Sequence, residues 1–266
     1  MIADDKARAG TIEGAETIDK QEGSPHGVLL LHGFGDTPQT LRLLAEHLRS
    51  DGYDVRAPLL PGHGRNVEAF MRSNRSDWLE CARTELETMR SSHSEVSVGG
   101  LSMGGALAAI VAADNPHLSS AVLISPYLNM PLPHRIACSM HWLWGQTPKK
   151  STSPRSILNP EERAKNLGYG VYTSRLLYEL SRLASEARRS LARIRVPTLI
   201  IQSRADPRIA PRVAEDALRR LGTKKKRLVW SEGGGHIITV DYGRERVFEE
   251  TSAWITAHAQ KQMTAR

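Results

Sequence analysis

The stretch that most constrains the fold of this chain is a serine between two glycines. It lies between a segment with the pattern of a strand and a segment with the pattern of a helix. Residues 95–98 form a short apolar, β-branched run, and an alanine-rich helical segment follows from Ala106 to Ala113. Between them stands Gly100-Leu-Ser102-Met-Gly104. The two glycines remove Cβ atoms that would collide where a strand turns sharply into a helix. The pattern predicts a strand, a tight turn and a helix, with Ser102 at the apex beside the helix N-terminus, where negative charge is favoured.

Strands and helices are expected to alternate on both sides of this turn. The continuous apolar run at 28–31 is typical of a strand buried on both faces of a parallel sheet, and further strands are expected at 121–124 and 196–201. Apolar residues at helical spacing lie between such runs, and the first of these helices is expected to begin at Pro38, with Asp36 or Thr37 as its cap. The alternation predicts an α/β fold with a doubly wound, mostly parallel sheet.

A break in this alternation divides the chain. Residues 126–193 begin with several prolines and end in leucines at helical spacing, so we expect a helical insertion there. The core is then 24–125 and 194–266, preceded by a polar N-terminal segment, 1–23, that is frayed or a weak edge strand. Aromatic residues of the insertion either pack it against the sheet or line a pocket; they are Trp142, Trp144, Tyr169 and Tyr172.

Composition excludes several classes of protein. The formal net charge is +7, but the basic residues are scattered, and the one dense run, 224–227, is expected to be a solvated loop rather than a nucleic-acid site. The two cysteines lack framework spacing, so no disulfide is expected. Neither a secretory signal nor a long apolar span is visible, which favours a soluble, cytoplasmic protein. No histidines stand at metal-ligand spacing, and we expect neither a metal nor a cofactor.

A serine hydroxyl becomes a strong nucleophile only when a base takes its proton and a third group holds that base in the right tautomer. In open α/β sheets such groups gather on loops at the carboxyl ends of strands. Asp206 follows the strand expected to end at Ile201, and His236 follows the strand expected to end at Trp230. The order Ser102, Asp206, His236 is the one that accompanies this kind of turn.

Other candidates for these two roles fit less well. Asp216 falls inside a helix, Asp241 comes after the histidine and Asp36 comes too early in the chain. His32 and His63 lie in glycine-rich loops, where we expect them to order the backbone. The remaining histidines considered are interpreted as surface or helix positions: His26, His47, His93, His117 and His258.

The developing oxyanion requires two backbone N–H donors. One is expected from Met103, which follows the nucleophile, and the other from the loop His32-Gly-Phe34-Gly35 after the first strand. Phe34 is the preferred donor, with Gly35 as the alternative.

The chain resembles the α/β-hydrolase superfamily, and within it the small carboxylesterases and monoacylglycerol-lipase-like hydrolases. The motifs that carry the resemblance are Leu29-Leu-Leu-His-Gly-Phe34, Leu60-Pro-Gly-His-Gly64, Gly100-Leu-Ser-Met-Gly-Gly105, Asp206-x-x-Ile209-x-Pro211 and Gly235-His-Ile-Ile-Thr-Val-Asp241. The resemblance implies a helical cap at 126–193 and hydrolysis of carboxylic esters with an apolar acyl chain. Gly35-Asp36 departs from the Thr-Gly or Gly-Gly that is commoner in the family.

These observations predict a serine hydrolase that cleaves small-molecule acyl esters, monoacylglycerol among the candidates, through an acyl-enzyme. A second hypothesis keeps the triad and changes the bond to a thioester, lactone, amide or carbon–carbon bond, because a fold does not fix a substrate. A third is a ligand-binding receptor that keeps the fold without turnover.

Overall fold

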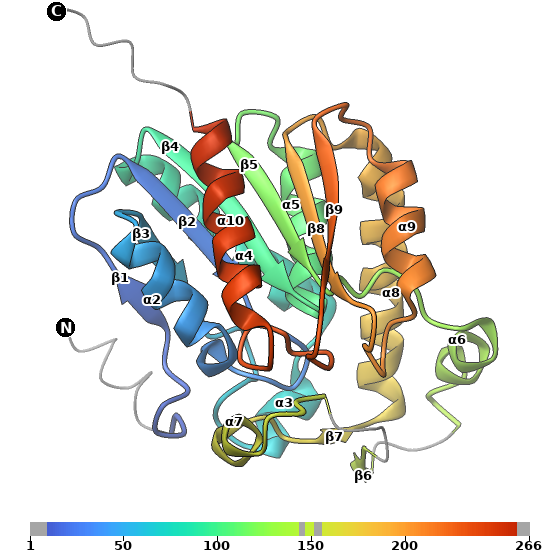
Figure 1. The fold of residues 1–266 in the computed structure, drawn as a ribbon. Coiled ribbons are helices and arrows are strands. Elements are labelled where there is room, and N and C mark those ends of the chain that lie inside the picture. The colour runs from blue at the N-terminus through green and yellow to red at the C-terminus, as the bar shows by residue number, and fades with distance from the viewer. Residues whose placement is uncertain (1–9, 144–146, 152–155, 260–266) are drawn as a thin grey trace, which may run out of the picture.

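The computed structural model describes residues 10–143, 147–151 and 156–259. Within these residues the centre is a seven-stranded sheet of order β1-β3-β2-β4-β5-β8-β9, in which β1 alone runs antiparallel to its neighbour (Figure 1). The strands of this sheet are β1 Ile18–Lys20, β2 His26–Leu31, β3 Asp54–Ala57, β4 Glu95–Leu101, β5 Ser120–Ile124, β8 Thr198–Ser203 and β9 Lys226–Ser231. The expected mostly parallel sheet is confirmed.

Helices cover both faces of the sheet. Their bounds are α2 Arg42–Ser50, α3 Val67–Arg72, α4 Arg75–Ser92, α5 Met103–Asp114, α8 Ser174–Ser190, α9 Pro211–Arg220 and α10 Arg244–His258. Successive side chains of a strand point to opposite faces. Accordingly Leu29 and Leu31 of β2 belong to one apolar cluster with α4, α5, α8 and α9, whereas Val28 and Leu30 belong to a second with α2 and α10 (Figure 1).

The strands at the centre of the sheet have apolar side chains on both faces because both faces are covered. Every residue of β2, β5 and β8 is buried, which accounts for the continuous apolar runs of the sequence. β1 is an edge strand, with Ile18 half-buried and the other two residues exposed. The described part of the polar N-terminal segment therefore contributes a short edge strand, one of the two expected outcomes.

The chain between β5 and β8 covers the range in which an insertion was predicted. It contains α6 Leu132–Ser139, β6 Lys149–Lys150, α7 Pro160–Lys165, β7 Val171–Tyr172, α8 and the 3-10 turn η2 Leu191–Arg193. β6 and β7 pair as a small antiparallel ribbon. Figure 1 shows α6, α7 and β7 beyond one end of the sheet, while α8 extends along α5.

Three local features differ from the sequence expectations. Pro38 begins a 3-10 turn, η1 Pro38–Leu41, rather than an α-helix, and no side chain caps it. α3 was not anticipated, and it begins where the Asn66 side chain accepts the N–H of Ala69. His26 lies in β2 and is 5% exposed, so its interpretation as a surface or helix position was wrong. His93 is the C-cap of α4 but is only 8% exposed, so it is a helix position and not a surface one.

No helix within the described residues is long and apolar enough to cross a bilayer. Cys81 and Cys138 are both free thiols.

Candidate active site

The turn between β4 and α5 has the geometry that the glycines predicted. Ser102 has φ +56° and ψ −112°, a conformation that side-chain-bearing residues rarely adopt. A Cβ on Gly100 would lie 2.2 Å from the carbonyl oxygen of Gly104, and a Cβ on Gly104 would lie 1.9 Å from the carbonyl oxygen of Leu31. Glycine is therefore required at both positions by close backbone approach. Ser102, between them, is the N-cap residue of α5.

The structure brings Ser102, Asp206 and His236 together at the carboxyl ends of β4, β8 and β9. His236 Nδ1 lies 2.7 Å from Asp206 Oδ2, and His236 Nε2 lies 2.8 Å from Ser102 Oγ. A carboxylate only accepts hydrogen bonds, so Nδ1 carries the proton and Nε2 is the lone-pair nitrogen that faces the hydroxyl. All three side chains are at most 9% exposed. This chain of contacts can transfer the serine proton to the imidazole.

Asp206 is held by more than the imidazole. Its Oδ1 accepts the N–H groups of Arg208 at 2.8 Å and Ile209 at 3.0 Å. Its Oδ2 also accepts Gln202 Nε2 at 2.8 Å. Gln202 belongs to β8 and is fully buried, and sequence reasoning missed it. The available signal was a glutamine directly after the apolar residues 199–201, four residues before the aspartate.

The other aspartates that were weighed do not touch the imidazole. Asp216 is paired with arginines of α8 and α9. Asp241 accepts backbone N–H groups, and Asp36 accepts a hydrogen bond from Asn166.

The loop after β2 passes beside Ser102. His32 is fully buried; its Nδ1–H donates to the carbonyl of Gly33 at 2.9 Å, and its Nε2 accepts the N–H of Leu60 at 3.0 Å. Burial lowers the pKa of His32 well below its ordinary value, so the ring stays neutral and orders the backbone as expected. A Cβ on Gly33 would lie 3.6 Å from Ser102 Cβ.

The two predicted oxyanion donors belong to segments that adjoin Ser102. The ring of Phe34 packs against Phe70 and Trp78, with centroids 5.0 Å and 6.0 Å away, and these contacts fix the loop. Met103 is the first residue of α5, where N–H groups lack intrahelical partners.

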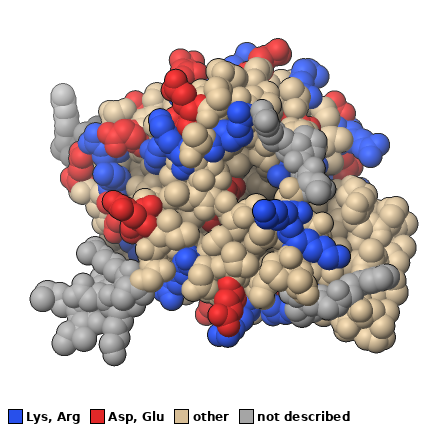
Figure 2. Space-filling model, turned by 90° about the horizontal axis from the view of Figure 1, so that it is seen from below, with Lys and Arg blue, Asp and Glu red and all other residues tan. Residues whose placement is uncertain are grey.

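A cavity of about 770 Å³ opens at Ser102 and His236. Figure 2 looks at this end of the molecule and shows a hollowed surface with both signs of charge near its rim. Much of the wall is apolar and comes from Tyr127, Met130, Cys138, Ile157, Val171, Leu177, Leu180 and Ile237. Polar side chains join it from Asp36, Ser156, Arg163, Asn166 and Arg208. An amphiphilic molecule matches such a mixed lining.

Asp36 is a pocket group that sequence reasoning did not recognise as one. Its Oδ1 accepts Asn166 Nδ2 at 3.3 Å, which links the loop after β2 to the insertion. Burial raises the pKa of Asp36 to about 6, although Asn166, His236 and Arg208 each act in the opposite direction. The wall of the cavity therefore holds a carboxyl group that titrates close to neutral pH.

The aromatic residues of the insertion have different environments. Tyr172 lines the cavity. Tyr169 stacks on Phe70 with centroids 5.1 Å apart, and its hydroxyl accepts the N–H of Arg65 at 2.8 Å. Trp142 is 71% exposed, so it does neither of the things expected of it, and Trp144 lies outside the described residues.

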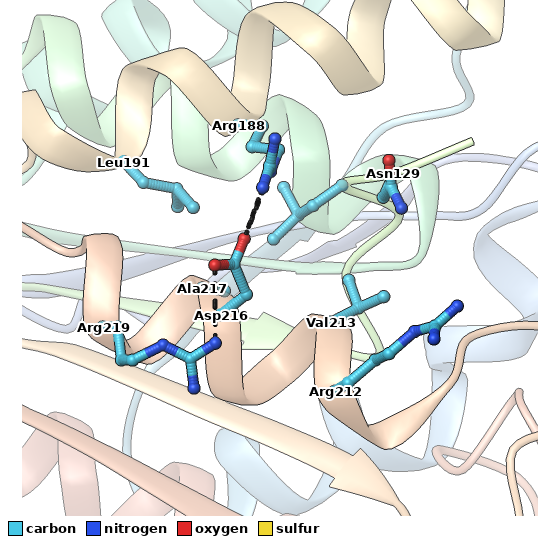
Figure 3. A pocket seen from close by; sticks show the side chains of 9 residues that line it. Asn129, Arg188, Leu191, Arg212, Val213, Asp216, Ala217 and Arg219 are labelled. Atoms are coloured by element: carbon cyan, nitrogen blue, oxygen red, sulfur yellow. Dashed lines mark hydrogen bonds and ion pairs between the residues drawn. The ribbon is translucent and has the colours of Figure 1, made fainter. Parts of the chain in front are cut away.

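A second, smaller cavity of about 260 Å³ lies between α8, α9 and the chain after β5. Figure 3 shows Arg188 and Arg219 directed at Asp216, and both are paired with its carboxylate. No triad residue lines this cavity, and the charged groups drawn at its centre already have partners. Among the described residues no cluster of His, Cys, Asp and Glu could hold a metal ion.

Comparisons with known proteins agree with this geometry. Residues 24–242 match the family model Hydrolase_4, described as "Serine aminopeptidase, S33". The chain is 32% identical over 249 residues to a thermostable monoacylglycerol lipase of Bacillus sp. (strain H-257), covering 93% of this chain and 97% of that protein. It is 28% identical over 237 residues to a carboxylesterase of Bacillus subtilis (strain 168), covering 86% and 92%.

Solved structures give the same result. A structure described under the metagenome-derived lipolytic enzymes LipS and LipT superposes with a TM-score of 0.86 at 30% identity, covering 93% of this chain and all of that one. The monoacylglycerol lipase of Paleococcus ferrophilus superposes with a TM-score of 0.77 at 19% identity, covering 91% and 98%, and shows the shared fold.

Proposed function

The chain belongs to the Hydrolase_4 family of α/β-hydrolases, and we propose that it cleaves carboxylic esters through an acyl-enzyme formed on Ser102. It is a serine hydrolase related to lipases and carboxylesterases. The observation that carries the proposal is the hydrogen-bonded line from Asp206 through His236 to Ser102, with contacts of 2.7 and 2.8 Å.

In the proposed reaction each of these groups has a role. His236 Nε2 takes the proton of Ser102 as Oγ attacks the ester carbonyl, and Asp206 stabilises the imidazolium and holds its orientation. The backbone N–H groups of Phe34 and Met103 bind the oxyanion. His236 then gives the proton to the leaving alcohol. Water, activated by the same imidazole, attacks the acyl carbon and releases the acid, which regenerates Ser102.

We further propose that the substrate is an amphiphilic ester with an aliphatic acyl chain, such as a monoacylglycerol. The apolar wall of the cavity suits an acyl chain, and its polar side chains suit an alcohol that carries hydroxyl groups. The 32% identity to a monoacylglycerol lipase supports the same class.

The test is hydrolysis of p-nitrophenyl esters from acetate to palmitate, and of monoacylglycerols of matched chain length, by the wild type and by Ser102→Ala. We expect Ser102→Ala to lose turnover on every ester while its circular dichroism spectrum and melting temperature remain close to those of the wild type. The preferred chain length then sizes the acyl part of the cavity. Ester hydrolysis that survives the substitution would refute the role of Ser102.

A further inference from the structure

Asp241 is a buried carboxylate that no step of the proposed reaction uses. It is 1% exposed, yet it accepts four backbone N–H groups. Oδ2 accepts those of Leu158 and Gly235, each at 2.8 Å. Oδ1 accepts those of Asn159 at 2.8 Å and Tyr242 at 2.9 Å. Four donors occupy the acceptor positions of the two carboxylate oxygens.

The four donors come from two parts of the chain. Gly235 and Tyr242 flank the loop that carries His236, whereas Leu158 and Asn159 belong to the insertion between β5 and β8. Asp241 therefore fastens the two segments to each other through main-chain groups. Hydrogen bonds between a charged acceptor and N–H donors are roughly twice as strong as neutral ones.

A second set of bonds joins the same two segments beside the imidazole. The carbonyl oxygen of Ser156 accepts the N–H of His236 at 2.8 Å and that of Ile237 at 3.0 Å. The hydroxyl of Ser156 also accepts Arg208 Nε, from the loop that carries Asp206. The short stretch 156–159 thus contacts both loops that supply the base and its carboxylate partner.

The contact between these segments is tight as well as polar. A Cβ on Gly235 would lie 2.7 Å from the carbonyl oxygen of Ser156 and 3.4 Å from Asp241 Oδ2. Ser156 and Ile157 line the catalytic cavity together with His236 and Ile237. Residues 156–157 and 235–237 therefore pack as one unit, which carries both the imidazole and a wall of the substrate pocket.

We propose that Asp241 is a positioning residue for His236, which locks the histidine loop to residues 156–159 of the pocket wall; this rests on the function proposed above. Neutralising the carboxylate leaves buried N–H groups without their charged acceptor, so the two segments separate. The imidazole then loses its alignment between Ser102 Oγ and Asp206, and the rate falls although all three triad residues are intact.

The experiment compares Asp241→Asn with a matched control, Asp54→Asn. Asp54 is 2% exposed and accepts the N–H groups of Glu22 at 2.7 Å and Gly23 at 3.2 Å, but it begins β3, at the opposite end of the sheet from the triad. Both substitutions should lower the melting temperature. Only Asp241→Asn should lower kcat, by about 100-fold, the loss that a misplacement of about 1 Å produces. Equal kcat values for the two variants, well below their melting temperatures, would overturn the proposal.

Two further measurements separate positioning from general damage. Amide hydrogen exchange of Asp241→Asn should rise together in the peptides covering 156–160 and 233–240, and in neither for Asp54→Asn. If Asp241→Asn does not fold, Gly235→Ala replaces it. The added Cβ forces the two segments apart at Ser156 and leaves Asp241 in place. An unchanged kcat of Gly235→Ala would also overturn the proposal. Wild type and Ser102→Ala run in parallel, so a missing Ser102-dependent activity marks failure of the proposed function instead.

Discussion

Replacing Gly104 with alanine places a Cβ against the backbone at the end of β2. The added Cβ would lie 1.9 Å from the carbonyl oxygen and 2.4 Å from the carbonyl carbon of Leu31, and 2.7 Å from the carbonyl oxygen of His32. Such contacts essentially never fall below 3.0 Å, so α5 and the end of β2 must separate by about 1 Å. All of these atoms are main chain, and no side-chain rotation relieves the clash.

That displacement occurs where the proposed oxyanion donors are held. Leu31 and His32 lead directly to Phe34, and Gly104 follows Met103, so the two N–H groups move apart. A misplacement of about 1 Å lowers a catalytic rate by about 100-fold, and overpacking an interior costs about 1–3 kcal/mol of stability. We therefore expect Gly104→Ala to fold with a lowered melting temperature and about 100-fold lower kcat.

The assay is kcat on p-nitrophenyl butyrate with a thermal melt, and Gly99→Ala is the control. Gly99 lies in β4 and is also buried, but a Cβ there meets first the Leu30 Cδ2 methyl, at 3.0 Å, and a side-chain end can rotate away. A Gly104→Ala enzyme as active as Gly99→Ala would refute the reasoning, because the backbone would then tolerate the approach that the glycine is inferred to permit.

Two other predictions concern pH and packing. Burial raises the pKa of Asp36 to about 6 from an ordinary value near 3.8, so folding takes up a proton between those pH values and stability falls as pH rises through them. Asp36→Asn should therefore melt higher than the wild type at pH 8 by a margin that shrinks toward pH 4; a margin independent of pH would contradict this. Leu183 of α8 is fully buried in the cluster that includes α5, and Leu183→Ala should lower the free energy of unfolding in urea by about 2–5 kcal/mol. A loss close to zero would mean that α8 does not pack as described.

The sheet and the triad could be predicted because local patterns encode them. Apolar runs mark strands covered on both faces, as in β2 and β8, and glycines around Ser102 mark backbones that approach closely. The order of Ser102, Asp206 and His236 then follows from which strand each residue succeeds.

What escaped prediction depends on partners distant in the sequence. His26 is buried because its ring contacts Ser97 Oγ at 2.9 Å, and His93 because its ring contacts Asp54 at 3.2 Å. Neither contact leaves a local pattern. Asp36 was predicted as a possible helix cap, but in the structure Asn166 of the insertion contacts it. The pKa of Asp36 is raised because the side chain is buried.

The twisted backbone of Ser102 has a consequence for anyone who would engineer this protein. A residue with a side chain held at φ +56° stores about 1–3 kcal/mol, and glycine at that position would release much of it. Random mutagenesis that is scored by heat resistance alone would accordingly enrich Ser102→Gly. That variant is more stable but lacks the proposed nucleophile. Stability and activity therefore favour different residues at position 102, and a screen has to select for both.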